Sequence, residues 1–240
     1  MEIASWNVNS IRARLEHVTT WLKARQPDVL LLQELKGTEF PADVFKKLGY
    51  ESVAVTQKAY NGVAILSRHP ITTISTTLAG DEADSHSRFL EAMIEGIRIV
   101  NIYLPNGNPV GSDNFAYKLA WMDRFHRQLE IWETKDPPTL IGGDFNVIPE
   151  DIDCTSLPPG YVMRSFSPSH APSIAVFSNL ATSTHFGRCI RVSRDSSPSG
   201  IISGKRLNTI VVFASIISCY GPHWLIDWSH AKLTEVREHR

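Results

Sequence analysis

Val29-Leu30-Leu31-Leu32-Gln33 is the stretch of sequence on which the fold prediction depends. A short, continuous apolar run bounded by polar residues is typical of a strand that is buried on both faces. Before it, residues 1–8 predict another strand, and apolar residues recur at helical spacing from Ile11 until Pro27 ends the run. The N-terminal sequence therefore predicts a strand, a helix and a second, fully buried strand.

Strand and helix signals continue to alternate as far as residue 142. Pro41 suits the first turn of a helix that runs to Lys47. Residues 115–134 carry apolar side chains on one face and predict a long amphipathic helix, and Glu95-Gly96 predicts a tight turn. Further strands are predicted over residues 51–55, 62–67, 89–95, 97–103 and 139–142. This order predicts an α/β fold with a mixed sheet.

The composition is that of a soluble globular protein. The chain is 42% hydrophobic and 20% charged, and its 240 residues are long enough to form one large domain or two small ones. The first residues contain no basic segment followed by an apolar stretch, and no later run approaches the roughly 20 apolar residues of a membrane span. Cys154, Cys189 and Cys219 lack metal-type or redox-type spacing, which argues against a disulfide framework. We therefore expect a cytoplasmic protein that does not associate with membranes.

Charge is distributed unevenly on either side of Cys154. Residues 1–154 carry 21 acidic and 15 basic side chains, whereas residues 155–240 carry 4 acidic and 9 basic ones. The second part also contains 15 serines and one long apolar stretch, residues 210–217, and its alternating strand and helix signals are lost. A basic tail ordinarily indicates nucleic-acid contact, and this composition is also that of a disordered extension.

Polar side chains that carry oxygen atoms follow several of the predicted strands. Asn7 ends the first strand, Glu34 follows the apolar run, and Asp144 and Asn146 follow Leu140-Ile141-Gly142-Gly143. In open sheets, functional groups collect at such strand ends. Asp144 and Asn146 are two residues apart, so their side chains leave an extended chain on the same face, and the two glycines allow a ligand to approach the backbone closely. We expect these side chains to reach into one pocket.

Carboxylate and amide oxygens are the ligands that Mg²⁺ prefers, with water and substrate phosphate completing its shell. Glu34 is the first choice of ligand; a cation there would polarise a phosphoryl oxygen, and Asp144 would deprotonate the attacking water. Taken alone, each residue has an ordinary explanation. Asn7 suits a turn or cap, Tyr103 suits half-buried packing, and Gly-Asp-x-Asn suits a turn. The occurrence of all these residues together, in this order along the chain, is much harder to explain by chance.

Five segments, in this order, resemble the successive motifs of the exonuclease III family within the endonuclease/exonuclease/phosphatase superfamily. They are Ser5-Trp6-Asn7-Val8-Asn9-Ser10-Ile11-Arg12, Leu32-Gln33-Glu34-Leu35-Lys36, Asn61-Gly62-Val63-Ala64-Ile65-Leu66-Ser67, Asn101-Ile102-Tyr103-Leu104-Pro105-Asn106-Gly107 and Gly142-Gly143-Asp144-Phe145-Asn146-Val147. The resemblance covers residues 1–154, and its Asn-Ser-Ile-Arg and Tyr-Leu-Pro-Asn-Gly segments indicate the DNA-repair branch. It implies an α/β sandwich of two packed sheets flanked by helices, of which only the first half is fully specified.

The resemblance implies a role for each candidate residue. Glu34 would be the principal ligand of Mg²⁺, or of Mn²⁺ in its place, with Asn7, Asp144 and Asn146 in the same metal pocket. Tyr103 would contact the phosphate, Asp144 would position or activate the water, and Asn146 would support the developing charge. The implied activities are 3′ to 5′ removal of nucleotides and incision beside abasic sites. The partner would be double-stranded DNA with abasic sites or 3′ ends, bound by a monomer.

The second half of the chain departs from the family. The family has an Arg-Ile-Asp-His segment and, near the C-terminus, a Ser-Asp-His whose Asp and His form the general-base pair; neither core is present here. Asp227-Trp228-Ser229-His230 has the right residue types, but its spacing and neighbours are wrong, so we interpret it as coincidence. No functional residue is therefore assigned beyond Asn146.

A shifted reading frame soon after Cys154 would explain this departure. Codons can be chosen for residues 180–191, 199–203 and 212–217 so that one neighbouring frame encodes family-like peptides, among them Phe-Trp-Asp-Tyr-Gln and Val-Arg-Ile-Asp-His. This hypothesis divides the chain into an N-terminal part of the nuclease domain, residues 1–154, and an out-of-frame, poorly ordered tail, residues 155–240. A genuinely divergent or disordered tail is the alternative.

Two classes of function follow from these observations. The first is a magnesium-dependent DNA repair nuclease, a phosphodiester hydrolase. The second is a catalytically dead remnant or binding module that keeps the metal pocket without its base, and a phosphatase of the same superfamily is a third hypothesis. Because the Asp-His pair is missing, we expect cleavage by this chain to be impaired while metal binding persists.

Overall fold

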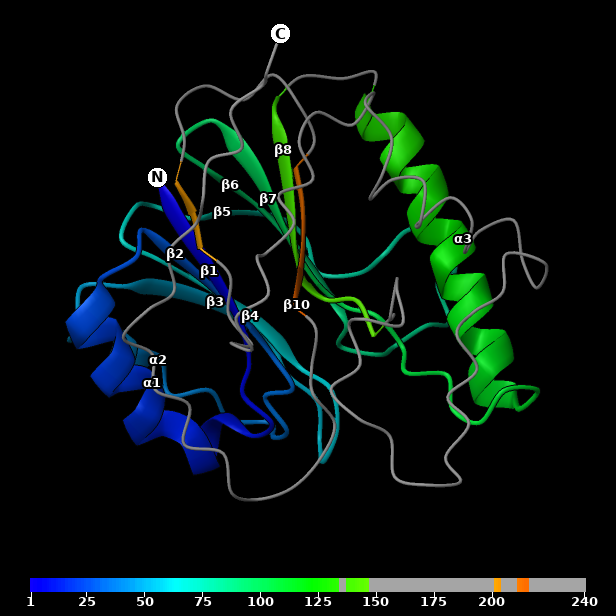
Figure 1. Cartoon of the computed structure of the whole chain (residues 1–240), viewed down its shortest axis with the longest axis horizontal. Helices are drawn as coiled ribbons and strands as arrows, with labels where there is room; N and C mark the ends of the chain where they lie inside the picture. The colour runs from blue at the N-terminus through cyan, green and yellow to red at the C-terminus, as the bar shows by residue number, and fades with distance from the viewer. Residues whose placement is uncertain (134–136, 147–200, 204–210, 216–240) are drawn as a thin grey trace, which may run out of the picture.

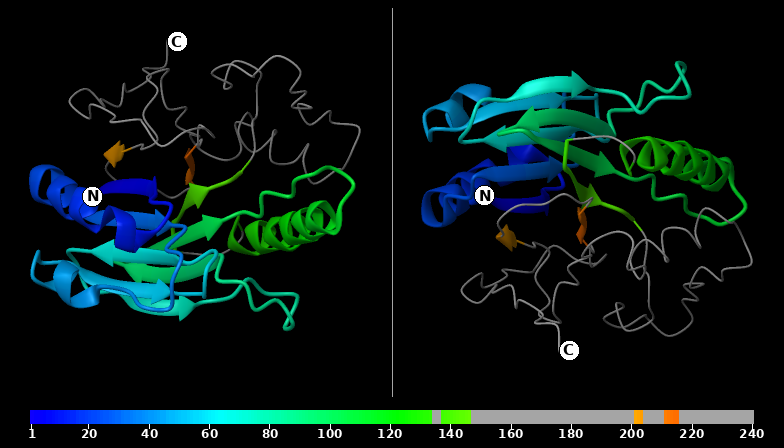
Figure 2. Two further views of the ribbon diagram at one scale, coloured as in Figure 1. Left: turned by 90° about the horizontal axis from the view of Figure 1, so that it is seen from below. Right: turned by 90° about the horizontal axis from the view of Figure 1, so that it is seen from above.

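Two mixed five-stranded sheets pack face to face in the computed structural model, which describes residues 1–133, 137–146, 201–203 and 211–215 (Figure 1). Among the described residues, helices cover the outer face of each sheet, two on the first sheet and one on the second (Figure 2). This arrangement confirms the predicted α/β sandwich of two sheets flanked by helices.

The first sheet is built around the two strands predicted at the N-terminus. In spatial order its strands are β3 (Glu51–Val55), β4 (Val63–Ser67), β2 (Val29–Gln33), β1 (Glu2–Asn7) and β9 (Ile201–Ser203). β1 and β2 run parallel because helix α1 (Ile11–Arg25) carries the chain back between them. Every residue of β2 is buried, as its apolar run predicts, because one face meets the helices and the other meets the second sheet.

The second sheet combines a parallel half with an antiparallel half. In spatial order its strands are β10 (Val211–Ser215), β8 (Thr139–Asp144), β7 (Ile97–Tyr103), β6 (Phe89–Ile94) and β5 (Thr72–Ser75). β7, β8 and β10 are parallel, and β5, β6 and β7 form an antiparallel meander. The turn between β6 and β7 has positive φ at Glu95 (50°) and Gly96 (74°), which confirms the predicted tight turn.

Serine side chains cap the amino ends of α1 and α3. The Ser10 Oγ accepts a hydrogen bond from the Ala13 amide at 3.4 Å at the start of α1. The Ser112 Oγ accepts one from the Phe115 amide at 3.3 Å, so α3 (Asp113–Glu133) begins slightly before the predicted residue 115. Helix α2 (Ala42–Lys46) is one turn long. Within the described ranges, no helix has the length and apolar character needed to cross a membrane.

Apolar side chains alternate between two sides of the first sheet. Val29 and Leu31 of β2 face the second sheet and pack in the same cluster as Leu90 of β6. Leu30 and Leu32 point the other way and pack under α1 and α2. This alternation follows from the period of two residues in a strand, and it explains why the run has to be apolar throughout.

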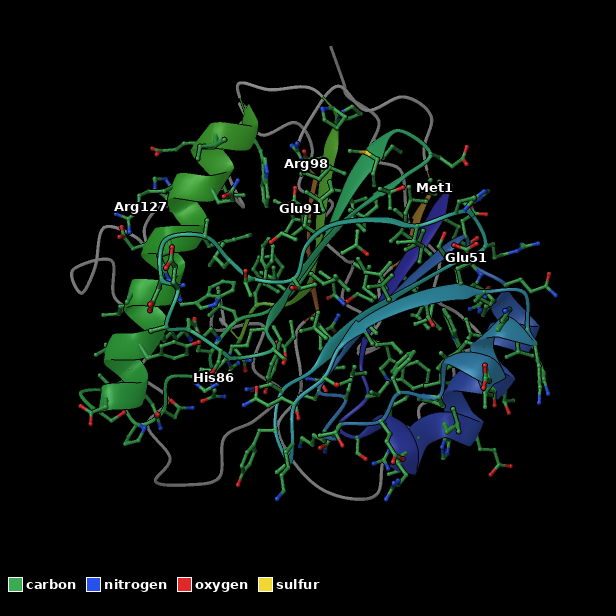
Figure 3. All side chains as sticks on the ribbon, turned by 180° about the vertical axis from the view of Figure 1, so that it is seen from behind. Met1, Glu51, His86, Glu91, Arg98 and Arg127 are labelled. Carbon is green, nitrogen blue, oxygen red and sulfur yellow. The ribbon has the colours of Figure 1, made fainter. Side chains whose placement is uncertain are left out.

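A buried ion pair lies between the second sheet and α3. The Arg98 Nε is 3.0 Å from the Glu91 Oε1, and the Arg98 guanidinium lies 5.5 Å from the ring centroid of Trp132. Both charged residues are labelled beside α3 in Figure 3. Burial raises the pKa of Glu91, and the adjacent guanidinium opposes that effect. The ion pair therefore lies under α3, where the helix covers the second sheet.

Three described strands were not predicted as part of the sheets. β5 is a short edge strand in which Thr72 and Thr73 are exposed, so it lacks the apolar alternation of a half-buried strand. β9 pairs antiparallel with β1, and β10 pairs parallel with β8. Both lie in the part of the chain after Cys154. The predicted poor order of residues 155–240 otherwise lies outside the described residues and stays a prediction.

Asn101 of β7 joins the two sheets through the middle of the core. Its Nδ2 donates hydrogen bonds to the Leu32 carbonyl at 2.9 Å and the Ala64 carbonyl at 2.7 Å, and its Oδ1 accepts one from the Gln33 Nε2 at 2.8 Å. All three partners belong to the first sheet. Because buried polar groups are costly when unpaired, this network favours one relative position of the two sheets.

Replacing Asn101 by Leu should lower the free energy of unfolding by about 2–4 kcal/mol, because Gln33 and two carbonyl groups would lose a buried partner. Urea unfolding followed by circular dichroism measures the loss. Asn114→Leu, at an exposed position of α3, is the matched control and should change the value by about 0.5 kcal/mol or less. An unchanged midpoint in the Asn101 variant would contradict this role.

Candidate active site

Four strands bring polar side chains to one edge of the sandwich. Asn7 is the last residue of β1, Glu34 follows β2, and Tyr103 and Asp144 are the last residues of β7 and β8. The first two strands belong to the first sheet and the other two to the second. The carboxyl ends of parallel strands meet at the same edge of a sheet, so the two sheets contribute jointly to one site.

Hydrogen bonds from Asn7 connect the two carboxylates of the site. The Asn7 Nδ2 donates to the Glu34 Oε1 and to the Asp144 Oδ2, each at 2.9 Å. The Tyr103 hydroxyl donates to the same Glu34 Oε1 at 2.9 Å. Side-chain hydrogen bonds therefore join four of the five residues singled out in the sequence, although up to 137 positions separate them along the chain.

Glu34 is directed into the site by a turn at the end of β2. Its φ is 55°, in the left-handed region that residues other than glycine seldom adopt. The Ser10 amide donates to the Glu34 carbonyl at 2.7 Å, and the Leu35 amide donates to the Gly62 carbonyl at 3.2 Å. Such a backbone conformation persists only where neighbouring groups fix it. The loops before α1 and β4 thus hold Glu34 in place.

The two carboxylates of the site differ in their affinity for protons. Burial raises the pKa of Glu34, but hydrogen bonds from Lys36 and Asn7 outweigh this effect and hold the pKa below its usual value. The Lys36 Nζ lies 2.7 Å from the Glu34 Oε2. Burial raises the pKa of Asp144 to about 6, against opposing hydrogen bonds. Glu34 is therefore the permanent anion, and Asp144 is the group suited to accept a proton near neutral pH.

Gly143 allows β8 to approach β7 at the floor of the site. A Cβ on Gly143 would lie 2.0 Å from the carbonyl oxygen of Ile102, and the φ of Gly143 is 137°. From the sequence we expected this glycine to let a ligand approach the backbone. The close approach is instead to the neighbouring strand, so the glycine serves the packing that positions Asp144.

Asn146 lies beside this cluster and is turned toward the loop that follows β7. Its Nδ2 donates to the Leu104 carbonyl at 2.8 Å, and its Oδ1 accepts from the Asn106 Nδ2 at 3.2 Å. Its backbone amide donates to the Asp144 Oδ1 at 3.0 Å. Asn146 therefore orients Asp144 through the backbone, and its contact with a metal or phosphate stays a prediction.

Lys118 of α3 is a buried residue near the site that the sequence analysis missed. Its Nζ donates to the carbonyls of Asn106 and Asn146, at 3.1 and 2.7 Å, and so ties together the loops after β7 and β8. Burial lowers the pKa of Lys118 to about 8. Lys118 stands three residues after Phe115 and four before Met122, on the apolar stripe of the helix, and that position was a signal of burial.

A basic pocket adjoins the site at the start of α1. It has a volume of about 270 Å³, and its lining includes three basic residues, Arg12, Lys36 and Lys58, and one acidic residue, Glu39, which pairs with Arg12. The amino end of α1 adds the positive end of a helix dipole. Lys36 lines the pocket and also forms the ion pair with Glu34, so the pocket borders the carboxylates of the site. We assigned no role to these basic residues from the sequence.

The donor groups of the site fit Mg²⁺. Glu34 and Asp144 supply carboxylate oxygens, and the Asn7 Nδ2 donates to both of them, while the Asn7 Oδ1 accepts from the Asn9 amide at 3.0 Å. Mg²⁺ is usually held by one or two carboxylates and keeps several waters. Over the part of the chain that the structure describes, no three His, Cys, Asp or Glu side chains are grouped to hold a metal ion, as a Zn²⁺ site would need. The residues present therefore suit a partly hydrated cation bound by oxygen.

The fold and this site define a known class of protein. Residues 4–202 match the Endonuclease/Exonuclease/phosphatase family, and the chain belongs to it. Within that family the chain is 31% identical over 160 residues to the exodeoxyribonuclease III of Haemophilus influenzae, which confirms the resemblance to the exonuclease III family. The matched segment covers 64% of this chain and 60% of that relative.

Solved structures agree with this relationship. An AP endonuclease from Archaeoglobus fulgidus is 39% identical with a TM-score of 0.61, over 65% of this chain and 61% of that one. A variant of the 3′ phosphatase NExo from Neisseria, bound to product DNA hairpin, is 31% identical with a TM-score of 0.65, over 76% of this chain and 70% of that one. The chain spans 51% to 61% of the length of the curated relatives it matches.

Proposed function

We propose that this chain carries the metal-binding and phosphate-binding part of a magnesium-dependent DNA repair nuclease of the exonuclease III type. The observation that carries the proposal is the Asn7 side chain, which donates to both Glu34 and Asp144 at 2.9 Å and so sets two carboxylates at one point between the sheets. The activities that we assign are 3′ to 5′ removal of nucleotides and incision beside abasic sites.

The cation of this site is Mg²⁺, with Mn²⁺ as a substitute that takes the same oxygen ligands. Glu34, with its depressed pKa, is the principal ligand, and Asp144, Asn7 and Asn146 complete the pocket. When bound, such a cation polarises a phosphoryl oxygen and stabilises the leaving alkoxide.

Three side chains of this chain contribute to the remaining steps. Burial raises the pKa of Tyr103, so its phenol stays neutral, and the hydroxyl that donates to Glu34 can turn to donate to a phosphate oxygen when substrate binds. Asp144, with a pKa of about 6, can hold the attacking water and take its proton at Oδ1 or Oδ2. The Lys36 ammonium, 2.7 Å from Glu34, adds positive charge where phosphate negative charge would develop.

Double-stranded DNA is the partner that the basic pocket favours. Arg12, Lys36 and Lys58 line it beside the amino end of α1, an arrangement suited to a phosphate backbone. Relatives named as an AP endonuclease and as a 3′ phosphatase bound to a DNA hairpin support abasic sites and 3′ ends as the substrates. We further propose that the protein acts as a monomer in the cytoplasm.

Cleavage by this chain should be impaired, because the general-base pair expected from the family's second half is absent from its sequence. The alternative function is therefore a catalytically dead remnant or binding module that retains the metal pocket. A phosphatase is a further candidate, favoured by the name of the Neisseria relative. Incubating the chain with an abasic-site duplex and with a 3′-phosphorylated duplex, each with and without Mg²⁺, separates these functions.

The chain should bind Mg²⁺ even if it cleaves DNA slowly, and Glu34→Gln should weaken that binding by about tenfold or more, because the site would lose its permanent anion. Isothermal titration calorimetry with MgCl₂ measures both affinities. Glu39→Gln, at a side chain that is 85% exposed, is the matched control and should bind as the parent does. Equal affinities for the parent and the Glu34 variant would show that the metal is held elsewhere.

A further inference from the structure

We propose that Arg88 is a positioning residue for Tyr103, which it holds in the orientation that places the phenol on Glu34. The inference rests on the proposed function, because Tyr103 is assigned there to the metal and phosphate site. Arg88 precedes β6 and lies opposite Tyr103 in the pairing of β6 with β7, where Phe89 pairs with Ile102. Two residues that face each other in this way share one side of the sheet.

Three contacts join Arg88 to Tyr103. The Arg88 Cζ lies 4.8 Å from the centroid of the Tyr103 ring, in a cation–π arrangement. The Arg88 Nη1 donates to the Tyr103 carbonyl at 3.2 Å, and the Tyr103 amide donates to the Arg88 carbonyl at 2.8 Å. The guanidinium therefore covers one face of the ring while its own fork is fixed to the backbone of the same residue.

The guanidinium of Arg88 is not committed to a carboxylate. Among the described residues none forms an ion pair with it, and its Nε is buried without a hydrogen-bond partner there. The Nε of Arg98, on the same sheet, is likewise buried without a hydrogen bond, but it differs in lying 3.0 Å from a carboxylate oxygen of Glu91. An arginine that served only to hold the fold would be expected to pair in the same way. The uncommitted charge is instead directed at the phenol.

The loop that carries Arg88 is fixed from two directions. Next to it, the Ser87 amide donates to the Gln57 Oε1 at 3.1 Å, which ties the loop to the segment after β3. Further back, Asp84 forms a buried ion pair with Arg124 of α3 and accepts the Tyr117 hydroxyl at 3.0 Å. Figure 3 shows His86 of the same loop, labelled near one end of α3. Arg88 is therefore preorganised before any ligand binds.

The orientation of Tyr103 matters because its hydroxyl shares the Glu34 Oε1 with Asn7. Rotation of the phenol would remove one of the two donors on that oxygen and change the field at the metal pocket. Partners one step beyond the ligands typically change metal affinity by about 10- to 100-fold when they are removed. Tyr103 is such a partner of Glu34, and Arg88 lies one step further away, behind Tyr103, so its removal should give an effect at the lower end of this range.

The test uses the full chain labelled with 3-fluorotyrosine and ¹⁹F NMR. The protein has six tyrosines, and the Tyr103 resonance is the one that disappears in Tyr103→Phe. In Arg88→Met, which keeps the side-chain length but removes the charge, this resonance should shift or broaden more than the other five, and the affinity for MgCl₂ should fall about tenfold. Arg88→Lys, which keeps the charge without the planar stack, should lie between the parent and Arg88→Met.

Arg127→Met is the matched control, because Arg127 is exposed on α3 and pairs only with its neighbour Asp123 among the described residues (Figure 3). It should leave the Tyr103 resonance and Mg²⁺ affinity unchanged. An unmoved Tyr103 resonance in both Arg88 variants, or unchanged Mg²⁺ affinity with a moved resonance, would overturn the proposal. If the parent chain bound no Mg²⁺, the proposed function would fail, and the ¹⁹F resonance alone would decide the positioning role.

Discussion

Gly143→Ala should leave the chain unable to form its sandwich. The added Cβ would lie 2.0 Å from the carbonyl oxygen and 2.8 Å from the amide nitrogen of Ile102. Both atoms are backbone, and β7 cannot move aside because it is paired with β6 on one side and with β8 on the other. The φ of 137° adds strain for any residue with a side chain.

The free energy of unfolding should fall by about 4–5 kcal/mol or more, which is comparable to the whole stability of many domains. Far-ultraviolet circular dichroism and the yield of soluble protein measure the outcome. Gly37→Ala is the matched control, because a Cβ there meets nothing within 4 Å, and its effect should be below about 1 kcal/mol. A cooperative urea transition for Gly143→Ala close to that of the parent would show that the strands can separate without cost.

Except for β5, β9 and β10, the described strands were predictable from local signals, and so were the positions of three site residues. The apolar run of β2 is continuous because both of its faces are covered, and Asn7, Glu34 and Asp144 stand where parallel strands end. The left-handed turn at Glu34 leaves no such signal. The turn depends on backbone hydrogen bonds with Ser10, in the loop before α1, and with Gly62, in the loop before β4, both of which are distant in the sequence.

Other features could not be predicted because they arise from contacts between distant segments. Lys118 lies on the apolar stripe of α3, but its role depends on the Asn146 carbonyl, 28 residues away. Arg88 contacts Tyr103 only because the turn between β6 and β7 sets their register. The two sheets are also joined by Asn101, which looks like an ordinary strand polar residue until its partners on β2 and β4 are known.

Restoring the family's second half should raise cleavage of abasic-site DNA by about 10² to 10⁴, the usual contribution of a positioned acid or base. The site residues in the first half can hold a cation and a phosphate, but the family's Asp-His pair is missing from this sequence. Metal binding should therefore be similar in the two proteins, while turnover differs.

The pairing of β10 indicates where the missing segment belongs. β10 runs parallel to β8 with Ser215 opposite Asp144, so its carboxyl end comes to the edge of the sheet where the site lies. Its sequence, Val-Val-Phe-Ala-Ser, contains no ionisable residue. The alternate frame over residues 212–217 permits Val-Arg-Ile-Asp-His, the family segment that comes before the Ser-Asp-His of the general-base pair, and it would bring an acid and an imidazole to this position. The frameshift hypothesis therefore predicts that the protein read in the alternate frame carries an Asp and a His next to the site, and that it cleaves DNA faster than this chain.

The experiment compares this chain with the protein read in the alternate frame after Cys154, both purified and assayed on a duplex with one abasic site, with and without Mg²⁺. In the restored protein, Glu34→Ala and Asp144→Asn should abolish most cleavage, and Tyr103→Phe should give a smaller loss because only one hydrogen bond to Glu34 is removed. Comparable cleavage by the two unsubstituted proteins would show that the missing pair is dispensable. A coding sequence with no family-like peptide in its other frames would rule out the frameshift and leave a divergent second half. The general base would then have to come from residues of this chain. Asp144 is one such residue, because its pKa of about 6 suits a general base.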